Sequence, residues 1–397
     1  MKIITVNTDF HGILSVSLAA LGLACASSLL SAQPVPQSVP RQAPATDSTP
    51  RLRVGGFVDS YYAWDAGRPP TRDRSFAGGT LFGTQPGRHN EFNVNLAYLD
   101  LTVDAPSHRG RVALQAGTSV QANYAAEPVV GQVSGPSVQQ FIQEAFAGIR
   151  LGRRAWVDAG IFFSNLGMEG WVSRDNLTYT RSLVADYSPY YSAGARLVYD
   201  ATPTLTARVD LVNGWQTISE ADDGKGLGIR LDWKPVAGRT VSYFSFTNAE
   251  GGGTVRHFHG IGASLARGPL TLLAEADGGI LRATSTSSRW YGLLGVVRTE
   301  LSPTVVIVGR LERYHDPDRA ALATGSIPGR GRAPDRINPG FRGSGASVGV
   351  DVRTTPGALW RTEVRGFTAR DPLFPNGATG ASRRTGGFLV TSLSVGF

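Results

Sequence analysis

The last twelve residues of the chain alternate between two kinds of side chain. Within residues 386–397, every second position from Leu389 to Phe397 is Leu, Thr, Leu, Val or Phe, and most positions between them are small or polar. Such a period of two predicts a β-strand with one apolar face. Similar segments of about ten residues recur from residue 51 onward between turn residues, and we count sixteen of them. Segments of this kind are typical of a β-barrel that spans a membrane.

The internal segments show the same alternation with charge on one face. In residues 226–234, Leu, Ile, Leu and Trp alternate with Gly, Arg, Asp and Lys, and residues 111–121 and 205–211 have comparable patterns. The alternation slips within residues 92–103, which predicts a β-bulge near Ala97. A soluble sheet protein would show the same period, so the pattern alone leaves open whether lipid or water meets the apolar face.

The lengths of the connections favour the membrane barrel. Tight and longer connections alternate along the chain, as in outer-membrane barrels with short periplasmic turns and longer external loops. This predicts an antiparallel up-and-down barrel with an even number of strands, about sixteen, and with both termini in the periplasm. The tight connections are residues 104–109, 151–154, 200–204, 234–239, 266–268, 301–304 and 354–357. The longer ones are residues 65–90, 123–137, 164–190, 216–225, 249–256, 278–288, 315–343 and 370–385.

Aromatic residues fall close to the predicted strand ends. Barrels in membranes carry belts of aromatic side chains at both lipid–water interfaces. With the first strand running outward, the external ends carry Trp64, Trp215 and Trp290, the periplasmic ends carry Trp156, Trp233, Trp360 and Phe397, and Trp171 alone falls inside a long loop. The pattern leaves the face of Trp156 and Trp290 open.

Composition adds a leader and a linker to this picture. The chain of 397 residues is 41% hydrophobic and only 18% charged, and it contains 49 Gly, which favours many short strands. Its one long apolar run, residues 13–30, follows Lys2 and precedes Ser31-Ala32, which predicts a secretory signal peptide over residues 1–32. An uncleaved anchor is the alternative. Residues 33–50 are rich in Pro, Gln, Ser and Thr and predict a disordered periplasmic linker before a barrel at residues 51–397.

The only cysteine, Cys25, falls within the predicted signal peptide, so we expect no disulfide in the mature chain. The formal net charge is +8. A basic balance can indicate nucleic acid, anionic lipid or anionic solutes. The Arg residues are scattered singly and form no stripe with aromatic residues between them, which argues against nucleic acid.

The charged positions on the strands point to a wet interior. A charged side chain facing lipid at mid-bilayer costs a few kcal/mol, so strand positions opposite the apolar face are expected to line the pore. Both signs occur there, which would give a transverse field that sorts solutes by charge. The alternative is that these groups are wall residues paired for stability. The pore-lining positions are Asp59, Arg111, Arg196, Arg208, Asp210, Arg230, Asp232, Glu275, Arg310, Glu312, Asp351, Arg353, Arg361, Glu363 and Arg365.

Two long loops are candidates for narrowing the pore. Residues 164–190 contain enough aromatic side chains to fold inward and pack. Residues 315–343 are basic and suggest an anion-leaning pore, although a mobile external loop rich in Gly and Pro is an equal alternative. The expected constriction residues of the first loop are Glu169, Trp171, Arg174, Asp175 and Arg181. The charged residues of the second are Arg319, Arg330, Arg332, Arg336 and Arg342 against Asp316, Asp318 and Asp335.

Signals of an enzyme are few. His257 and His259 would share one face of a strand, but no Cys or carboxylate stands near them in sequence, and two solvated histidines are the plainer interpretation. Asp222 or Asp223 could pair with one of them on neighbouring strand ends. Neither a nucleophile elbow nor a phosphate-binding loop supports catalysis. We therefore expect no catalytic residues, no metal and no cofactor.

The central part of the chain carries a family resemblance. Gly160-Ile-Phe-Phe-Ser-Asn-Leu-Gly167-Met-Glu169, then Asn213-Gly214-Trp215, and later Arg310-Leu-Glu312, resemble the OmpL-like β-barrel porin family over roughly residue 54 to the C-terminus. The resemblance implies an outer-membrane pore without specifying a substrate. After Asn213-Gly214-Trp215 the chain has Glu220-Ala-Asp222-Asp223-Gly224 in place of the Asn-rich loop expected for the family.

Together these observations predict a porin of the bacterial outer membrane through which small polar or anionic solutes diffuse passively. Its expected partners are outer-membrane lipid, those solutes and the barrel assembly machinery, which Phe397 would contact. A homotrimer is left open. The alternatives are a plugged outer-membrane barrel that acts as a surface enzyme or adhesin, and a soluble all-β binding protein.

Overall fold

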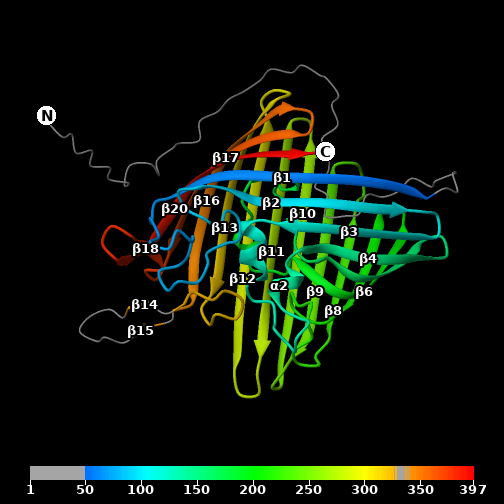
Figure 1. Cartoon of the computed structure of the whole chain (residues 1–397), viewed down its shortest axis with the longest axis horizontal. Helices are drawn as coiled ribbons and strands as arrows, with labels where there is room; N and C mark the ends of the chain where they lie inside the picture. The colour runs from blue at the N-terminus through cyan, green and yellow to red at the C-terminus, as the bar shows by residue number, and fades with distance from the viewer. Residues whose placement is uncertain (1–49, 326, 329–335, 338) are drawn as a thin grey trace. The chain divides into compact units, whose positions relative to one another are not determined.

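The chain folds into one closed β-barrel. A computed structural model describes residues 50–325, 327–328, 336–337 and 339–397. Within them, sixteen strands pair antiparallel with their neighbours and the last pairs with the first (Figure 1). This confirms the predicted all-β fold and its strand number. The predicted signal peptide lies outside the described residues, and so does the predicted linker except for Pro50.

The barrel is built from strands of eight to fifteen residues, joined by loops that contain short helices and hairpins. Among the described residues, no helix combines the length and apolarity needed to cross a membrane. The barrel strands are β1 (Arg51–Asp65), β2 (Phe92–Asp104), β3 (His108–Ala116), β4 (Ile142–Leu151), β5 (Ala155–Phe163), β6 (Tyr191–Thr202), β7 (Leu205–Val212), β8 (Gly226–Trp233), β9 (Arg239–Glu250), β10 (Thr254–Arg267), β11 (Leu270–Arg282), β12 (Ser287–Glu300), β13 (Val305–Asp316), β16 (Phe341–Thr355), β17 (Ala358–Ala369) and β20 (Thr385–Gly396). The loops hold α1 (Thr118–Tyr124), α2 (Pro136–Gln139), η2 (Ser173–Asp175), α3 (Leu183–Asp186), β14 (Ile327–Pro328), β15 (Arg336–Ile337), β18 (Phe374–Asn376) and β19 (Ala381–Arg383).

The barrel closes between β1 and β20. The two strands are paired from Phe57 opposite Gly396 to Asp65 opposite Phe388. Beyond this ladder, the Phe397 N–H donates to the Gly56 carbonyl at 3.0 Å, and the Gly56 N–H donates to the Phe397 carbonyl at 2.9 Å. The Phe397 side chain is 73% exposed on the outer face. The closing strand therefore uses every residue to the end of the chain.

Alternation along the strands separates an apolar outer face from a charged inner one. In β8, Leu227, Leu231 and Trp233 are exposed on the outside, whereas Arg230 and Asp232 are buried inside. Successive side chains of a strand point to opposite faces, so alternating apolar and charged residues place apolar side chains outside and charged ones inside. A lipid-facing Arg or Lys at the bilayer midplane costs about 2–4 kcal/mol, which explains why charge is kept on the inner face.

The connections at the two ends of the barrel differ. The end with all seven predicted tight connections is called here the turn end, and the opposite end the loop end. The expectation that every loop-end connection is longer is wrong for two of them, because only residues 251–253 join β9 to β10 and only residues 283–286 join β11 to β12. Gly252 and Gly253 have φ of 72° and 76°, which lets the chain reverse tightly. The surrounding residues that were expected in loops extend the strands instead.

The strand predicted at residues 111–121 ends earlier than expected. β3 stops at Ala116, and Gly117 has φ of 140°, a conformation in which a Cβ would overlap the Asn95 carbonyl. Helix α1 follows, and its Ser119 hydroxyl donates to the Asn95 carbonyl at 2.6 Å. The bulge predicted near Ala97 lies at Asn95, because Asp59 pairs with Leu96 and Ser60 with Val94.

The aromatic belt is only partly as predicted. Trp64, Trp233 and Trp360 are exposed on the outer face. Trp290 is only 3% exposed and Trp215 is partly buried, and the two rings lie in an interior cluster with Phe258. The prediction of interfacial positions is therefore wrong for Trp215 and Trp290, because neighbouring aromatic side chains inside the barrel bury these rings.

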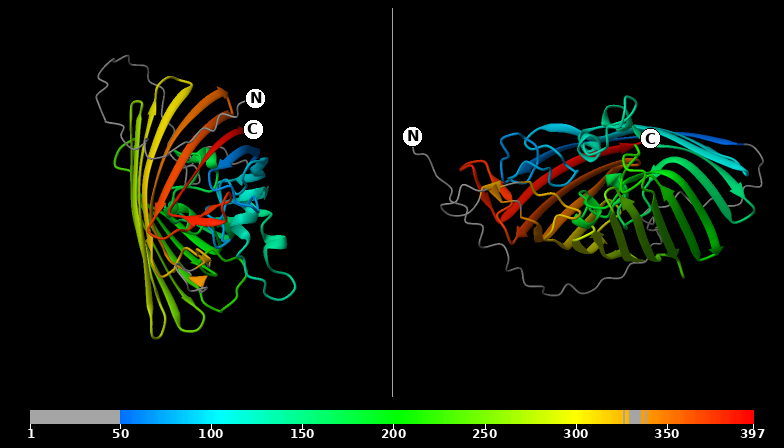
Figure 2. Two further views of the ribbon diagram at one scale, coloured as in Figure 1. Left: turned by 90° about the vertical axis from the view of Figure 1, so that its left-hand side faces the viewer. Right: turned by 90° about the horizontal axis from the view of Figure 1, so that it is seen from below.

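Loops fold into the barrel and fill much of its interior. Phe76 and Phe82 from the loop of residues 66–91 pack against Phe341, Phe367 and Phe374. These rings belong to one buried cluster that also includes residues of β9 to β13. Figure 2 shows the blue and green loop segments on the concave side of the yellow strands. The interior thus combines a polar wall with an aromatic core to which both strands and loops contribute.

Candidate functional site

The loop of residues 164–190, called here the inner loop, crosses the inside of the barrel. It connects β5 to β6, but its hydrogen-bond partners come from strands around the whole wall. These partners include Asp59 on β1, Gln115 on β3, Arg230 on β8, Glu275 on β11, Arg310 and Glu312 on β13, and Arg361, Glu363 and Arg365 on β17.

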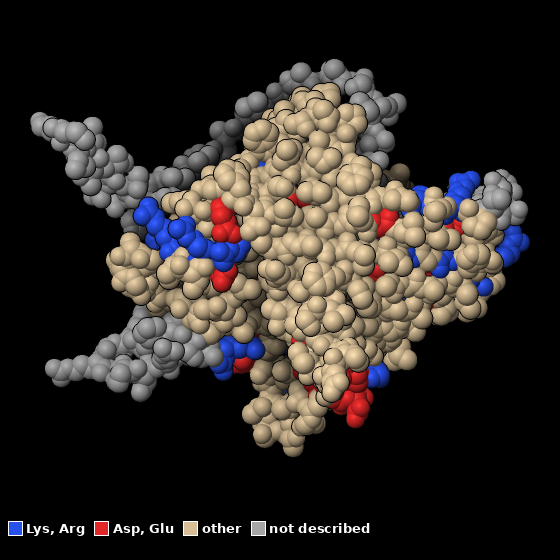
Figure 3. All heavy atoms as spheres, viewed as in Figure 1, with Lys and Arg blue, Asp and Glu red and all other residues tan. Residues whose placement is uncertain are grey.

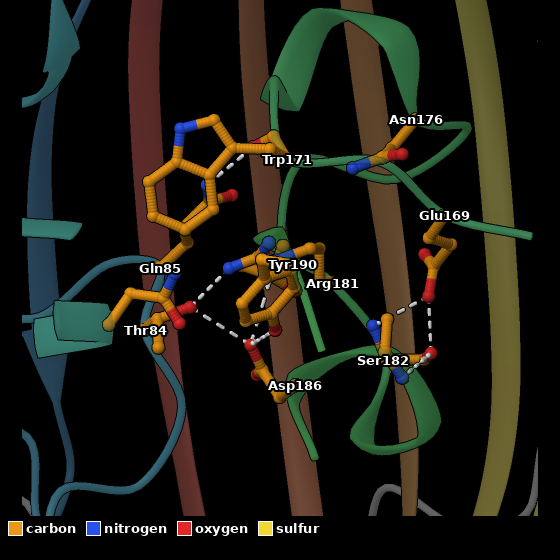
Figure 4. Close-up of polar contacts among 12 residues, drawn as sticks. Thr84, Gln85, Glu169, Trp171, Asn176, Arg181, Ser182, Asp186 and Tyr190 are labelled. Carbon is orange, nitrogen blue, oxygen red and sulfur yellow. Dashed lines mark hydrogen bonds and ion pairs between the residues drawn. The ribbon is translucent and has the colours of Figure 1, made fainter. Parts of the chain in front are cut away.

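The inner loop has a structure of its own. Asn176 closes one turn, because its side-chain amide donates to the Gly170 carbonyl at 2.9 Å and accepts from the Gly170 N–H at 2.7 Å. Ser182 caps α3 by accepting from the Ala185 N–H. Glu169 accepts hydrogen bonds from the backbone N–H and the hydroxyl of Ser182 (Figure 4). Burial raises the pKa of the Glu169 carboxyl above its ordinary value, against the opposing effect of Arg310 and these bonds.

Three arginines of β13 and β17 bind backbone carbonyls of the inner loop. Arg361 donates to Ser173 at 2.6 Å and to Leu177 at 2.8 Å. Arg310 donates to the Thr180 carbonyl at 2.6 Å, and Arg365 donates to the Arg181 carbonyl at 2.7 Å. Each guanidinium also holds a wall carboxylate, so it links the loop to the strands.

Carboxylates of the wall bind the donors of the same loop. Glu363 accepts from the Thr180 N–H at 2.8 Å, and Glu312 accepts from the Leu183 N–H at 2.7 Å. Across the barrel, Glu275 accepts from the Met168 N–H at 3.0 Å, and Asp59 accepts from the Ser173 hydroxyl at 2.8 Å. Hydrogen bonds to a charged group contribute about 1.5–3 kcal/mol each. The inner loop is therefore strongly fixed.

Arg181 joins the inner loop to the loop of residues 66–91. Its side chain is fully buried, with the guanidinium carbon 3.4 Å from the Tyr190 ring centroid and 4.8 Å from that of Trp171. It forms an ion pair with Asp186 at 3.6 Å and donates to the Thr84 hydroxyl (Figure 4). Cation–π contacts that are shielded from water contribute about 2 kcal/mol, so this cluster stabilises the C-terminal half of the inner loop.

Two glycines in the wall make room for the inner loop. A Cβ at Gly262 on β10 would overlap the Met168 side chain, and one at Gly292 on β12 would overlap Cγ1 of Val184. The missing side chains let the loop lie directly on the strands. This is a packing requirement on the wall that alternation alone does not predict.

Most predicted pore-lining residues lie inside the barrel, but they are buried and paired. Their role in lining a conducting path stays a prediction. The buried ones are Asp59, Asp210, Arg230, Asp232, Glu275, Arg310, Glu312, Asp351, Arg361, Glu363 and Arg365. Those that retain partial exposure are Arg111, Arg196 and Arg208, which form ion pairs with Asp100 and Glu144, with Asp210, and with Asp232, respectively.

Arg353 differs from the other expected pore residues. Its side chain is 41% exposed near the turn-end rim, where it pairs with Glu300 at 2.6 Å and donates to the Pro303 carbonyl. Arg353 has the same strand parity as the buried Asp351, and its role in lining a conducting path stays a prediction.

The predicted constriction residues divide into two groups. Glu169, Trp171 and Arg181 are buried in the contacts of the inner loop, whereas Arg174 and Asp175 remain about one-third exposed. In the second predicted loop, the side chains of Arg330, Arg332, Asp335 and Arg336 lie outside the described residues.

Several interior charges were missed from the sequence. Arg109 and Asp158 form a buried ion pair at 2.6 Å, and Glu144 binds Arg111 and the Phe163 N–H. Arg256 lies 4.8 Å from the Trp215 ring centroid. The parity of β4, β5 and β10 was sufficient to find Glu144, Asp158 and Arg256.

Comparison with protein families shows which family the chain belongs to. The family model described as "Putative beta-barrel porin-2, OmpL-like" matches residues 51–397. The chain belongs to this family. The family resemblance drawn from the sequence is thereby confirmed, and the chain is an outer-membrane β-barrel of the porin type.

Several solved structures share the fold of this family member. An anion-selective porin from Comamonas acidovorans is 11% identical, with a TM-score of 0.56 over 88% of this chain and 100% of that one. A loop L8 deletion mutant of OmpT, an outer membrane protein of Vibrio cholerae, is 7% identical, with a TM-score of 0.55 over 88% and 100%. OmpF from Salmonella typhi in complex with daunomycin is 12% identical, with a TM-score of 0.53 over 87% and 97%. These identities support the shared fold alone. No curated protein sequence matches the chain.

The part of the chain that the structure describes contains no group of three or more His, Cys, Asp or Glu arranged to hold a metal. His257 and His259 instead contact single neighbours, the Thr247 hydroxyl at 3.0 Å and the Tyr243 hydroxyl at 2.8 Å. The absence of a metal and of a cofactor from the working protein stays a prediction.

The fit between Gly292 and the inner loop gives a testable expectation. Gly292→Ala should displace α3 and destabilise the seated loop by about 1–3 kcal/mol, the usual cost of overpacking. The displacement should expose Arg181, so limited trypsin digestion of the folded barrel in detergent should cut the variant within the inner loop faster than the wild type.

Gly295→Ala is the matched control on the same strand, because a Cβ at Gly295 meets no atom within 4 Å. Val184→Ala removes the atom that overlaps and should restore protection to Gly292→Ala. Equal cleavage of both glycine variants would contradict the assignment of Gly292 as a seat for the loop.

Proposed function

We propose that this protein lets small polar solutes, including anions, diffuse passively across the outer membrane between the inner loop and the barrel wall. The observation that carries the proposal is an inner loop fixed by charged groups inside a sixteen-stranded barrel. Barrels of about this strand number can enclose an aqueous channel, and charged groups at a constriction sort solutes by charge.

Arg174 is the charge of the inner loop that we assign to solute selection. Its side chain is 36% exposed, and its nearest ion-pair contact, to Asp175, is long at 4.0 Å. The guanidinium carbon lies 5.0 Å from the ring centroid of Phe57 on β1. An Arg held against an aromatic ring and only weakly paired keeps its positive field available to a passing anion.

Purified protein in planar lipid bilayers should form open channels that carry a measurable ion current. Arg174→Gln should lower the permeability ratio of chloride to potassium roughly twofold, because it removes one accessible positive charge from the path. Reversal potentials across a salt gradient measure this ratio. Arg267→Gln, which changes an exposed arginine at the end of β10, is the control and should leave the ratio unchanged. Folded protein that never conducts would contradict the proposal.

A second function is favoured by one observation. Arg310 and Glu363 are fully enclosed beneath the inner loop, which is the arrangement of a plugged barrel. Such a barrel would act at the cell surface as an enzyme or adhesin. The same bilayer measurement separates the two functions, because a plug that is never released gives no conductance.

The orientation and the partners complete the proposal. We infer that the turn end and both termini face the periplasm and that Phe397 is recognised by the barrel assembly machinery. We also propose a homotrimer in outer-membrane lipid. Polar pairs on the outer face support it, because Tyr243 with His259 and Arg313 with Ser344 interrupt the apolar belt.

A further inference from the structure

A cleft lies at the loop end of β1, apart from the inner loop. Its volume is about 400 Å³. β1 supplies one wall, and the loop of residues 66–91 supplies the remainder. The lining residues are Trp64, Arg68, Pro69, Pro70, Arg72, His89 and Asn90.

The backbone around the cleft is held in an uncommon conformation. Arg68, Arg72 and Asn90 have φ of 46°, 67° and 57°, in the left-handed region that residues other than Gly rarely adopt. The neighbouring structure fixes this conformation, because the His89 N–H donates to the Arg72 carbonyl at 2.8 Å. The Gly67 carbonyl also accepts from the Gly377 N–H at 2.7 Å. Strained residues of this kind cluster at ligand sites, and the cleft is therefore a preformed feature.

The two arginines of the cleft have no direct ion-pair partner, and the nearby charge of Glu91 acts on Arg72 only at longer range. Across the described part of the chain, neither Arg68 nor Arg72 has an ion pair or a side-chain hydrogen bond, and both are exposed. The acids of this loop segment are already engaged, since Asp65 binds Arg74 at 3.1 Å, and Asp73 and Glu91 bind Arg88 at 2.6 Å and 2.9 Å. Figure 3 shows basic side chains gathered, with acidic ones beside them, at the end of the barrel where β18 lies in Figure 1.

The other polar groups of the cleft are also arranged as donors. Nδ1 of His89 accepts from the Asp65 N–H at 2.9 Å, so the ring proton of the neutral form is on Nε2. Oδ1 of Asn90 accepts from the Tyr62 hydroxyl at 2.7 Å, which leaves the Asn90 NH₂ group for a ligand. Two guanidinium groups, an imidazole N–H and an amide NH₂ are complementary to an anion with several acceptor oxygens.

We propose that this cleft binds a phosphate group. The guanidinium fork matches phosphate geometry better than it matches a monatomic anion. Trp64 is exposed on the outer face of β1 beside the cleft, at the end of the barrel where a lipid headgroup would lie. The phosphate therefore belongs to an outer-leaflet lipid headgroup or to a free phosphorylated solute, and the two sources share one site.

The test uses the full-length protein folded in phosphate-free nonionic detergent. Isothermal titration calorimetry measures the binding affinity for three probes. They are lipid A bearing two phosphates, lipid A from which both phosphates have been removed, and inorganic phosphate. The site variant is R68Q/R72Q. The control is R289Q, which alters an exposed arginine at the loop end of β12. Heat-modifiable gel mobility confirms that each variant is folded.

We expect the wild type and R289Q to bind a phosphate-bearing probe and R68Q/R72Q to bind it at least about tenfold more weakly, as expected for lost hydrogen bonds to a charged group. Binding of phosphorylated lipid A alone assigns the site to a headgroup, and binding of inorganic phosphate assigns it to a free solute. The proposal is overturned if neither phosphorylated lipid A nor inorganic phosphate binds. It is also overturned if lipid A without phosphate binds equally well, or if R289Q weakens binding as much as R68Q/R72Q.

Discussion

The double substitution Arg361→Gln with Asp351→Asn should increase the single-channel conductance by at least about twofold by releasing the inner loop. Arg361 donates to carbonyls of Ser173, Asn176 and Leu177, and hydrogen bonds to a charged group contribute about 1.5–3 kcal/mol each. Changing Asp351 at the same time avoids a buried unpaired carboxylate. Planar-bilayer recording measures the conductance, and trypsin sensitivity of the inner loop reports its release.

The control for this experiment is a second buried pair of the wall. Arg109 and Asp158 are paired at 2.6 Å, and neither side chain binds the inner loop among the described contacts. Arg109→Gln with Asp158→Asn should therefore leave the conductance unchanged while disturbing the wall comparably. Release of the loop without any rise in conductance would show that the loop does not limit the passage.

Deletion of Phe397 should have the largest effect on assembly. The two hydrogen bonds between Gly56 and Phe397 extend the closing ladder, and the Phe397 ring lies so near Gly56 that a Cβ there would overlap it. The truncated chain should be exported but should yield roughly tenfold less heat-modifiable barrel in the outer membrane. Cell fractionation with immunoblotting measures this yield.

Phe397→Tyr is the conservative control, because it keeps an aromatic ring and the backbone bonds at the same place. It should assemble nearly as well as the wild type. Normal assembly of the truncated chain would contradict both the role of Phe397 in closing the barrel and its proposed recognition by the assembly machinery.

The strands and their faces were largely predictable because each depends on local sequence. Arg230 and Asp232 lie opposite Leu231 by parity alone, and the structure places them inside the barrel. The two tight loop-end connections were not predicted, since glycine-rich segments such as residues 251–253 suit a long loop as well as a tight turn. The end of β3 depends on contacts between α1 and β2 that are distant in sequence.

The contact partners of the interior charges could not be predicted from local sequence. Arg361 is 188 residues from Ser173, and Glu363 is 183 residues from Thr180. Parity predicts that such side chains point inward, but it does not predict which part of the chain will meet them there. The same limit applies to Trp290, which faces inward by the parity of β12 but whose packing partners Trp215 and Phe258 come from other segments.

The distant contacts of the inner loop also imply an order of assembly. Its central residues bind Asp59 near the start of the barrel, and they bind Arg361 and Arg365 near its end. Contacts between segments so far apart in sequence form slowly, and those with Arg361 and Arg365 form only after β17 is present. A nascent barrel that lacks β17 would therefore hold an incompletely seated inner loop, and seating would be completed only as the seam between β1 and β20 closes.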